Sequence, residues 1–148
     1  MQEKPVPGEG PYLTMAVLCE KVLREQDGVL SVIRIIDRLT HTVIGSSLPD
    51  TLPPFDHQLV AALSFKSGQA RGRAIVRVVI EQPSGMRLPQ EIVQHVHFEG
   101  AERGINVLAD LSLRLSQEGL YWFDVFLDDR LFTRIPLRVV YQPTPVGQ

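Results

Sequence analysis

Cysteine is nearly absent from this sequence of 148 residues. The one cysteine, Cys19, has no second cysteine with which to form an internal disulfide, and it lies in an apolar segment where a buried, unreactive thiol is expected. The first residues contain neither a basic region followed by an apolar stretch nor a small-residue cleavage site. Because disulfides mark oxidising compartments, we expect a cytoplasmic protein.

Long apolar runs and an excess of either charge are also absent. No segment approaches the roughly 18 uninterrupted apolar residues of a membrane-spanning helix, so we expect no membrane insertion. The 15 Lys and Arg residues against 17 Asp and Glu give a formal net charge of −2, which supplies no overall attraction for nucleic-acid phosphates. The chain also lacks a Gly-rich loop that ends in lysine, a dinucleotide-binding fingerprint and a serine nucleophile elbow, and these absences exclude several common enzyme classes.

What dominates the sequence is an alternation of apolar and polar side chains with a period of two residues. In residues 71–81 one face would consist of Ala74, Val76, Val78 and Ile80. A turn at residues 83–85 ends this expected strand. The same alternation runs through residues 55–65 and 105–115, so each of these segments would bury one face.

Further apolar segments complete an all-β pattern. Residues 13–23 and 28–39 are rich in branched side chains, although helical spacing also fits residues 12–25 and 105–119, which leaves helix as an alternative there.

Residues 120–140 read as a terminal hairpin that turns at Asp128 and Asp129. In its second strand, Pro136 removes a backbone donor, which favours an edge position or a bulge. We therefore expect an all-β fold, a single antiparallel β-sandwich of roughly eight strands over residues 12–141, with flexible tails at 1–11 and 142–148.

The order of these segments resembles a family of small bacterial proteins of unknown function. The best-matching pieces are IIDRL at residues 35–39 and GLYWFDVFLDDRL at residues 119–131. The Gly-x-Tyr/Trp-x-Phe start and the Asp-containing turn of the second piece are shared with many bacterial immunoglobulin-like sandwiches. The resemblance implies an immunoglobulin-like antiparallel β-sandwich, and it implies no activity and no catalytic residue.

One segment, VQHVHFEG, resembles a metal site. It places His95, His97 and Glu99 at every second position, so a strand would carry the two histidines on one face, about 6.6 Å apart. Two imidazoles at that spacing can hold zinc, but a zinc site needs a third ligand, for which His57 and Asp110 are candidates on other segments. The alternative is a polar strand face without metal. We adopt this alternative, and we expect neither a metal site nor a cofactor.

A basic stripe is a candidate binding surface. Arg71, Arg73 and Arg77 share one face of the expected strand at 71–81, where they could hold a phosphate or an acidic partner. A solvated face that protects a strand edge is the alternative. No aromatic residues are interleaved with the arginines, as single-stranded nucleic acid would favour, so nucleic-acid binding is not expected.

The longest polar connection, residues 39–57, is a second candidate. It contains His41, Asp50 and Asp56, together with several prolines. Connections of this length are often functional, although a plain crossover between two sheets would also need the length.

These observations favour a non-enzymatic interaction module or accessory subunit that binds an unidentified partner protein through its loops or an edge strand. The sequence does not indicate an oligomeric state. A small-ligand or carbohydrate-binding sandwich is one alternative, and it would need an exposed aromatic platform, for which Tyr121 and Trp122 are the adjacent pair. A metal-dependent enzyme that uses His95 and His97 is the other alternative.

Overall fold

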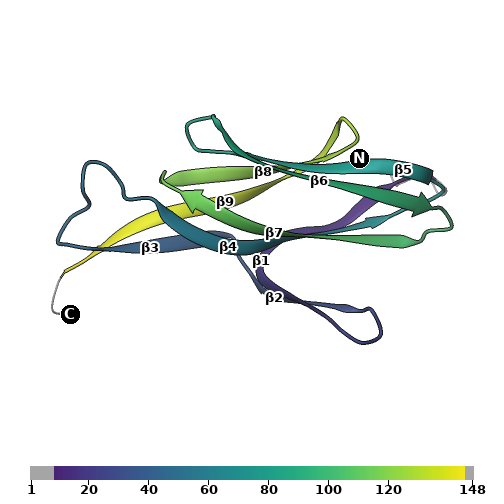
Figure 1. The fold of residues 1–148 in the computed structure, drawn as a ribbon, viewed down its shortest axis with the longest axis horizontal. Coiled ribbons are helices and arrows are strands. Elements are labelled where there is room, and N and C mark those ends of the chain that lie inside the picture. The colour runs from purple at the N-terminus through teal and green to yellow at the C-terminus, as the bar shows by residue number, and fades with distance from the viewer. Residues whose placement is uncertain (1–8, 146–148) are drawn as a thin grey trace, which may run out of the picture.

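The structure, a computed structural model, describes residues 9–145 as nine strands in two sheets, and it contains no helix in this range. The strands are β1 (Tyr12–Arg24), β2 (Leu30–Ile35), β3 (Arg38–Ile44), β4 (Phe55–Lys66), β5 (Arg71–Glu81), β6 (Arg87–Glu99), β7 (Gly104–Leu115), β8 (Gly119–Leu127) and β9 (Arg130–Thr144). One sheet has the order β2-β1-β4-β7 and the other β3-β9-β8-β5-β6. Figure 1 shows the two layers stacked, with the hairpin of β1 and β2 projecting away from them. The all-β class is confirmed, and both segments for which helix was an alternative are strands.

The structure has nine strands where roughly eight were expected, because the segment at residues 28–39 divides between the two sheets. Arg34 adopts a left-handed backbone conformation (φ 56°), and the Ile36 N–H still donates to Leu18 of the first sheet. One residue later, the Asp37 carbonyl accepts from the Arg138 N–H of the second sheet. The chain then forms β3, which pairs in parallel with β9, so the fold is not wholly antiparallel.

The new strand also changes two expected boundaries. β3 occupies the first part of the expected loop at 39–57, which leaves residues 45–54 as the connection to β4. Because Ile44 of β3 pairs with Thr144, β9 continues beyond the expected boundary at Tyr141.

The expected tails are described only in part. Residues 1–8 and 146–148 lie outside the described residues. Glu9 lies close against the backbone of Gly68, where an added Cβ would come within 1.8 Å of the Glu9 carbonyl oxygen. The described end of the N-terminal segment is therefore placed against the fold.

The inner faces of the two sheets enclose one hydrophobic core. The alternation expected for β4, β5 and β7 is confirmed by the buried side chains of Leu59, Ala61, Leu63, Phe65, Ala74, Val76, Val78, Ile80, Val107, Ala109, Leu111, Leu113 and Leu115. Each large apolar side chain buried in this way contributes roughly 1.5–3 kcal/mol, so this double layer is the main source of stability.

Tyr121 forms the corner hydrogen bonds typical of immunoglobulin-like folds. Its side chain is fully buried, and its hydroxyl accepts from the backbone N–H groups of Ser116 and Gln117 at 3.4 and 3.1 Å. In immunoglobulin domains a tyrosine near the start of strand F makes this contact, two residues before a cysteine. Here Phe123 occupies that later position, so the corner is present without the disulfide.

The terminal hairpin forms as expected, with Asp128 in a left-handed conformation (φ 51°) at the turn. Pro136 faces Trp122 of β8, whereas β3 first pairs with β9 at Arg138. β9 is therefore an interior strand of the sheet, but Pro136 lies in the part of it that β3 does not cover. A missing N–H group is tolerated there because no described strand would accept from it.

Candidate functional site

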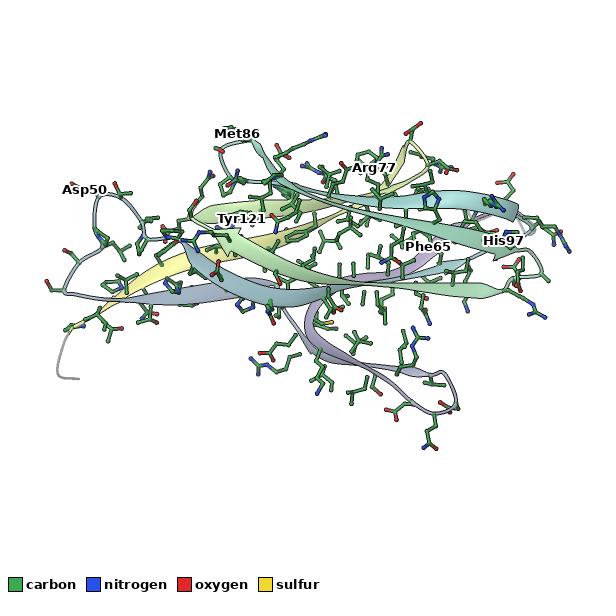
Figure 2. The ribbon with its side chains drawn as sticks, viewed as in Figure 1. Asp50, Phe65, Arg77, Met86, His97 and Tyr121 are labelled. Carbon is green, nitrogen blue, oxygen red and sulfur yellow. The ribbon has the colours of Figure 1, made fainter. Side chains whose placement is uncertain are left out.

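The six candidate binding residues do not form one site. Figure 2 shows Asp50 at one end of the molecule and His97, which pairs with Arg73, at the other. Asp50 and Arg73 are therefore separated by most of the length of the molecule.

The histidine pair lies on the solvent face of β6. His95, His97 and Glu99 are all exposed, as the alternation predicts, and Glu99 forms an ion pair with Arg103 at 3.2 Å. Neither proposed third ligand can join them. His57 occupies an inward-facing position on β4, and its Nε2 is buried without a hydrogen-bond partner among the described residues, while Asp110 is exposed on β7 of the other sheet. Within residues 9–145, no three His, Cys, Asp or Glu side chains gather closely enough to hold a metal ion.

The loop between β3 and β4 is anchored to the core by an aromatic cluster. His41 stacks on Phe55 with ring centroids 4.2 Å apart and planes 5° apart, and Tyr141 meets both rings edge-on. The Tyr141 hydroxyl donates to the Pro53 carbonyl at 2.8 Å. Burial raises the pKa of this hydroxyl, which therefore remains a donor well above neutral pH. His41 thus has a structural role.

The two carboxylates among the candidates in residues 39–57, Asp50 and Asp56, lie at the surface. Asp50 is exposed at the tip of the loop (Figure 2). Asp56 accepts from Arg114 across the β4–β7 ladder at 3.1 Å. An exposed pair of this kind contributes no more than about 1 kcal/mol.

Charged pairs cover the outer face of the five-stranded sheet. Arg77 Nε lies 2.6 Å from a Glu91 carboxylate oxygen, although the two are not aligned as a hydrogen bond. Arg134 bridges Asp124 at 2.7 Å and Glu81 at 2.6 Å. Hydrogen bonding to Asp124 raises the pKa of Arg134, so the guanidinium stays charged.

The aromatic platform that a carbohydrate site would need is not formed by Tyr121 and Trp122. Tyr121 points into the core, as described above. Trp122 lies on the outer face, where the Arg134 guanidinium covers its ring at 4.7 Å from the centroid. A sugar would have to displace this cation from the ring.

Side chains cap the edge where β6 approaches β7. Gln90 Nε2 donates to the Ser112 carbonyl at 2.5 Å, and Gln94 Nε2 donates to the Leu108 carbonyl at 3.1 Å. Edge strands carry unpaired backbone groups that can accept a foreign strand, and the two glutamines occupy such groups on β7. Two carbonyl groups of the β7 edge are thereby unavailable to a foreign strand.

The opposite edge extends into a projecting arm, which we define as residues 20–35. β1 pairs with β4 only from Tyr12 to Cys19, and beyond Lys21 it pairs with β2 alone. β2 is the outermost strand of its sheet, so its outer edge meets no described strand. Figure 1 shows the arm standing clear of both layers.

Apolar side chains lie on both faces of the arm, whereas its turn at residues 25–28 is polar. Side chains alternate along β2, so Leu30 and Val32 face one side and Ile33 the other. Val29 is 59% exposed and Ile35 65% exposed. Isolated two-stranded hairpins are marginal in water, and an exposed apolar arm of this kind is typical of a contact surface.

Local contacts hold the arm in a defined shape. Gly28 (φ 86°) closes the turn by donating to the Glu25 carbonyl at 3.0 Å, and Asp27 accepts from the Val29 N–H at 3.1 Å. At the base, the left-handed Arg34 forms an ion pair with Glu20. The arm is thus a formed hairpin.

Comparison with known proteins places the chain in a family. Residues 14–140 match the model of a family of unknown function, DUF6941. The chain belongs to DUF6941. No curated protein matches it in sequence.

Two solved structures resemble this DUF6941 protein at low identity. A β-glucosidase from Listeria innocua, solved in complex with glucose, is 10% identical over 87% of the chain, with a TM-score of 0.49, and the match spans 17% of the glucosidase. An immunoglobulin-like protein from Pseudomonas aeruginosa is 15% identical over 89% of the chain and 98% of its own length, with a TM-score of 0.43. Neither likeness bears on activity.

The arm of this DUF6941 protein is the feature that sequence reasoning missed. Its two strands were expected, but their separation from the sheets was not, because alternation does not reveal which residues lack a neighbouring strand. Cys19, at the base of the arm, is fully buried, and burial raises the pKa of its thiol, which agrees with the expected unreactive thiol. The described residues contain no helix able to cross a bilayer.

Proposed function

We propose that this protein is a non-enzymatic interaction module whose arm binds a partner protein by accepting an extended segment of the partner at the outer edge of β2. The observation that carries this proposal is a formed edge strand with apolar side chains on both faces. A partner strand would satisfy the backbone groups of this edge and bury apolar area on both sides at once. We propose a cytoplasmic location, because Cys19 is a free thiol.

Two of the other edge strands, β7 and β3, support the choice of β2. Glutamine side chains cap β7 where it faces β6. On its outward face β3 exposes Arg38, Thr40 and Thr42, with Ile44 as its single apolar residue, so an added strand would bury less apolar area there than at β2. The partner segment is therefore expected to be extended, with apolar side chains on both of its faces.

The test uses Val32→Lys, because a charge on an edge strand opposes strand addition. Thr40→Lys on β3 is the matched control. We expect a partner isolated from the native host to crosslink to residues of the arm, and its purified segment to bind Val32→Lys at least tenfold more weakly than either the wild type or the control. Crosslinks that map elsewhere, or equal binding to Val32→Lys, would contradict the proposal. A wild-type dimer that Val32→Lys converts to monomer in sedimentation equilibrium would assign the edge to a second copy of the chain.

A further inference from the structure

A cleft of about 280 Å³ opens at the end of the molecule where β5 begins, and it is independent of the arm. β5 pairs with β8 only from Val76 onward, so residues 71–74 extend beyond the end of β8. Asp128 of the β8–β9 turn closes this gap at Ile75, accepting its N–H at 3.0 Å. The cleft lies beside residues 71–74, the part of β5 that no strand covers on the β8 side.

Two small residues leave the space empty. Along β5 the core positions hold Val76, Val78 and Ile80, but the corresponding positions at the start of the strand are Gly72 and Ala74. A Cβ added at Gly72 would meet no atom within 4 Å. The cleft is therefore a place where the inner face of the sheet is left unfilled.

The apolar wall of the cleft is fixed by packing on the core. Phe98 and Phe132 line it, and both rings meet the buried Phe65 edge-on, with centroids 6.3 and 5.9 Å away. Leu127 completes this wall. Rigid aromatic surfaces of this kind can receive a flat or aliphatic ligand body without rearrangement.

Three arginines without carboxylate partners lie at the rim of the cleft, Arg71 and Arg73 on the outer face of β5 and Arg130 at the start of β9. Arg71, Arg73 and Arg130 line the cleft, and none forms an ion pair within residues 9–145, in contrast to Arg77 and Arg134.

Packing positions two of these guanidinium groups. Arg71 passes over Gly100, where an added Cβ would lie 3.0 Å from its Nε, and Arg130 lies over the Phe132 ring at 5.2 Å from the centroid. Asp128 is the one carboxylate in the lining, so three positive charges against one negative leave a net charge of +2.

We propose that this cleft binds a small organic anion with an apolar body. Its phosphate or carboxylate group would be held by Arg71, Arg73 and Arg130, since guanidinium groups match such anions geometrically and keep their charge. The apolar body rests against Phe98, Phe132 and Leu127. Either half of such a ligand alone would gain only part of the interaction.

The test is isothermal titration calorimetry with 2-naphthyl phosphate, compared with inorganic phosphate and 2-naphthol. We expect saturable binding of one 2-naphthyl phosphate per chain, and binding at least tenfold weaker for phosphate or naphthol alone. The double variant Arg71→Gln, Arg73→Gln should lose at least tenfold in affinity. Arg138→Gln, an exposed arginine on β9 that also lacks an ion pair among the described residues, should bind as the wild type does.

A second variant distinguishes binding in the cleft from nonspecific attraction to the positive charge around it. Ala74→Leu fills the space while keeping all three arginines, and it should abolish binding while the melting transition remains cooperative. The proposal is overturned if 2-naphthyl phosphate does not saturate, if phosphate alone binds as tightly, or if the double arginine variant binds as the wild type does.

Discussion

Tyr121 shows how one hydroxyl group can fix the geometry of a whole connection. Its ring lies in the core, and its hydroxyl oxygen accepts hydrogen bonds from two backbone N–H groups in the short segment between β7 and β8. This fixes where β8 enters the five-stranded sheet. The sequence revealed an aromatic residue at an inward position, but not the hydrogen bonds, because its partners lie in an irregular segment that no periodicity describes.

Changing Tyr121 to Phe should lower the free energy of unfolding by about 1–3 kcal/mol, because two partly buried N–H groups lose their acceptor. Urea unfolding measures this change. Tyr141→Phe is the comparison, since it removes a single hydrogen bond to Pro53 at the loop. If Tyr121→Phe costs no more than Tyr141→Phe, the corner does not hold the connection in the way described.

At the level of the strands, alternation predicted most of the fold but did not predict which strands form the edges of the two sheets. The inward faces of β4, β5 and β7 follow directly from the sequence, because a period of two residues is a local property. The division at residues 36–37 and the parallel pairing of β3 with β9 depend on contacts about 100 residues apart in the chain. The sequence identified His41 and Asp56 as polar candidates. It could not identify their partners Phe55 and Arg114, because these contacts depend on how the strands pair.

The glutamine cap on β7 can be tested by Gln94→Glu. At neutral pH a carboxylate cannot donate to the Leu108 carbonyl, so we expect a loss of about 1–2 kcal/mol in urea unfolding. Below about pH 4 the acid becomes protonated and can donate again, so the difference from the wild type should shrink as the pH falls. Gln58→Glu, on the exposed face of β4, should show little change at either pH. An equal loss at both pH values would rule out the hydrogen bond as the cause.

As a whole, the molecule has one side where side chains bridge the two sheets and one side that is open. Glutamine side chains bridge β6 and β7, whereas the chain leaves the two layers at β1 and β2 and returns at β3. The cluster of core residues includes Leu18 and Ile36 but no residue of the arm. Stability and contact surface are therefore expected to reside in different parts of the chain, with the stability in the two layers.

Replacing residues 21–33 by an Asn-Gly turn tests this separation. The new turn joins Glu20 to Arg34 and keeps the pairing of Cys19 with Ile35. Because a two-stranded hairpin contributes little by itself, the shortened protein should unfold in one cooperative transition, with a free energy of unfolding within about 1 kcal/mol of the wild type. Circular dichroism during thermal and urea unfolding measures both properties. A loss of several kcal/mol would mean that the arm folds back onto the four-stranded sheet in solution. The edge of β2 would then be covered by the chain itself, and no partner strand could reach it.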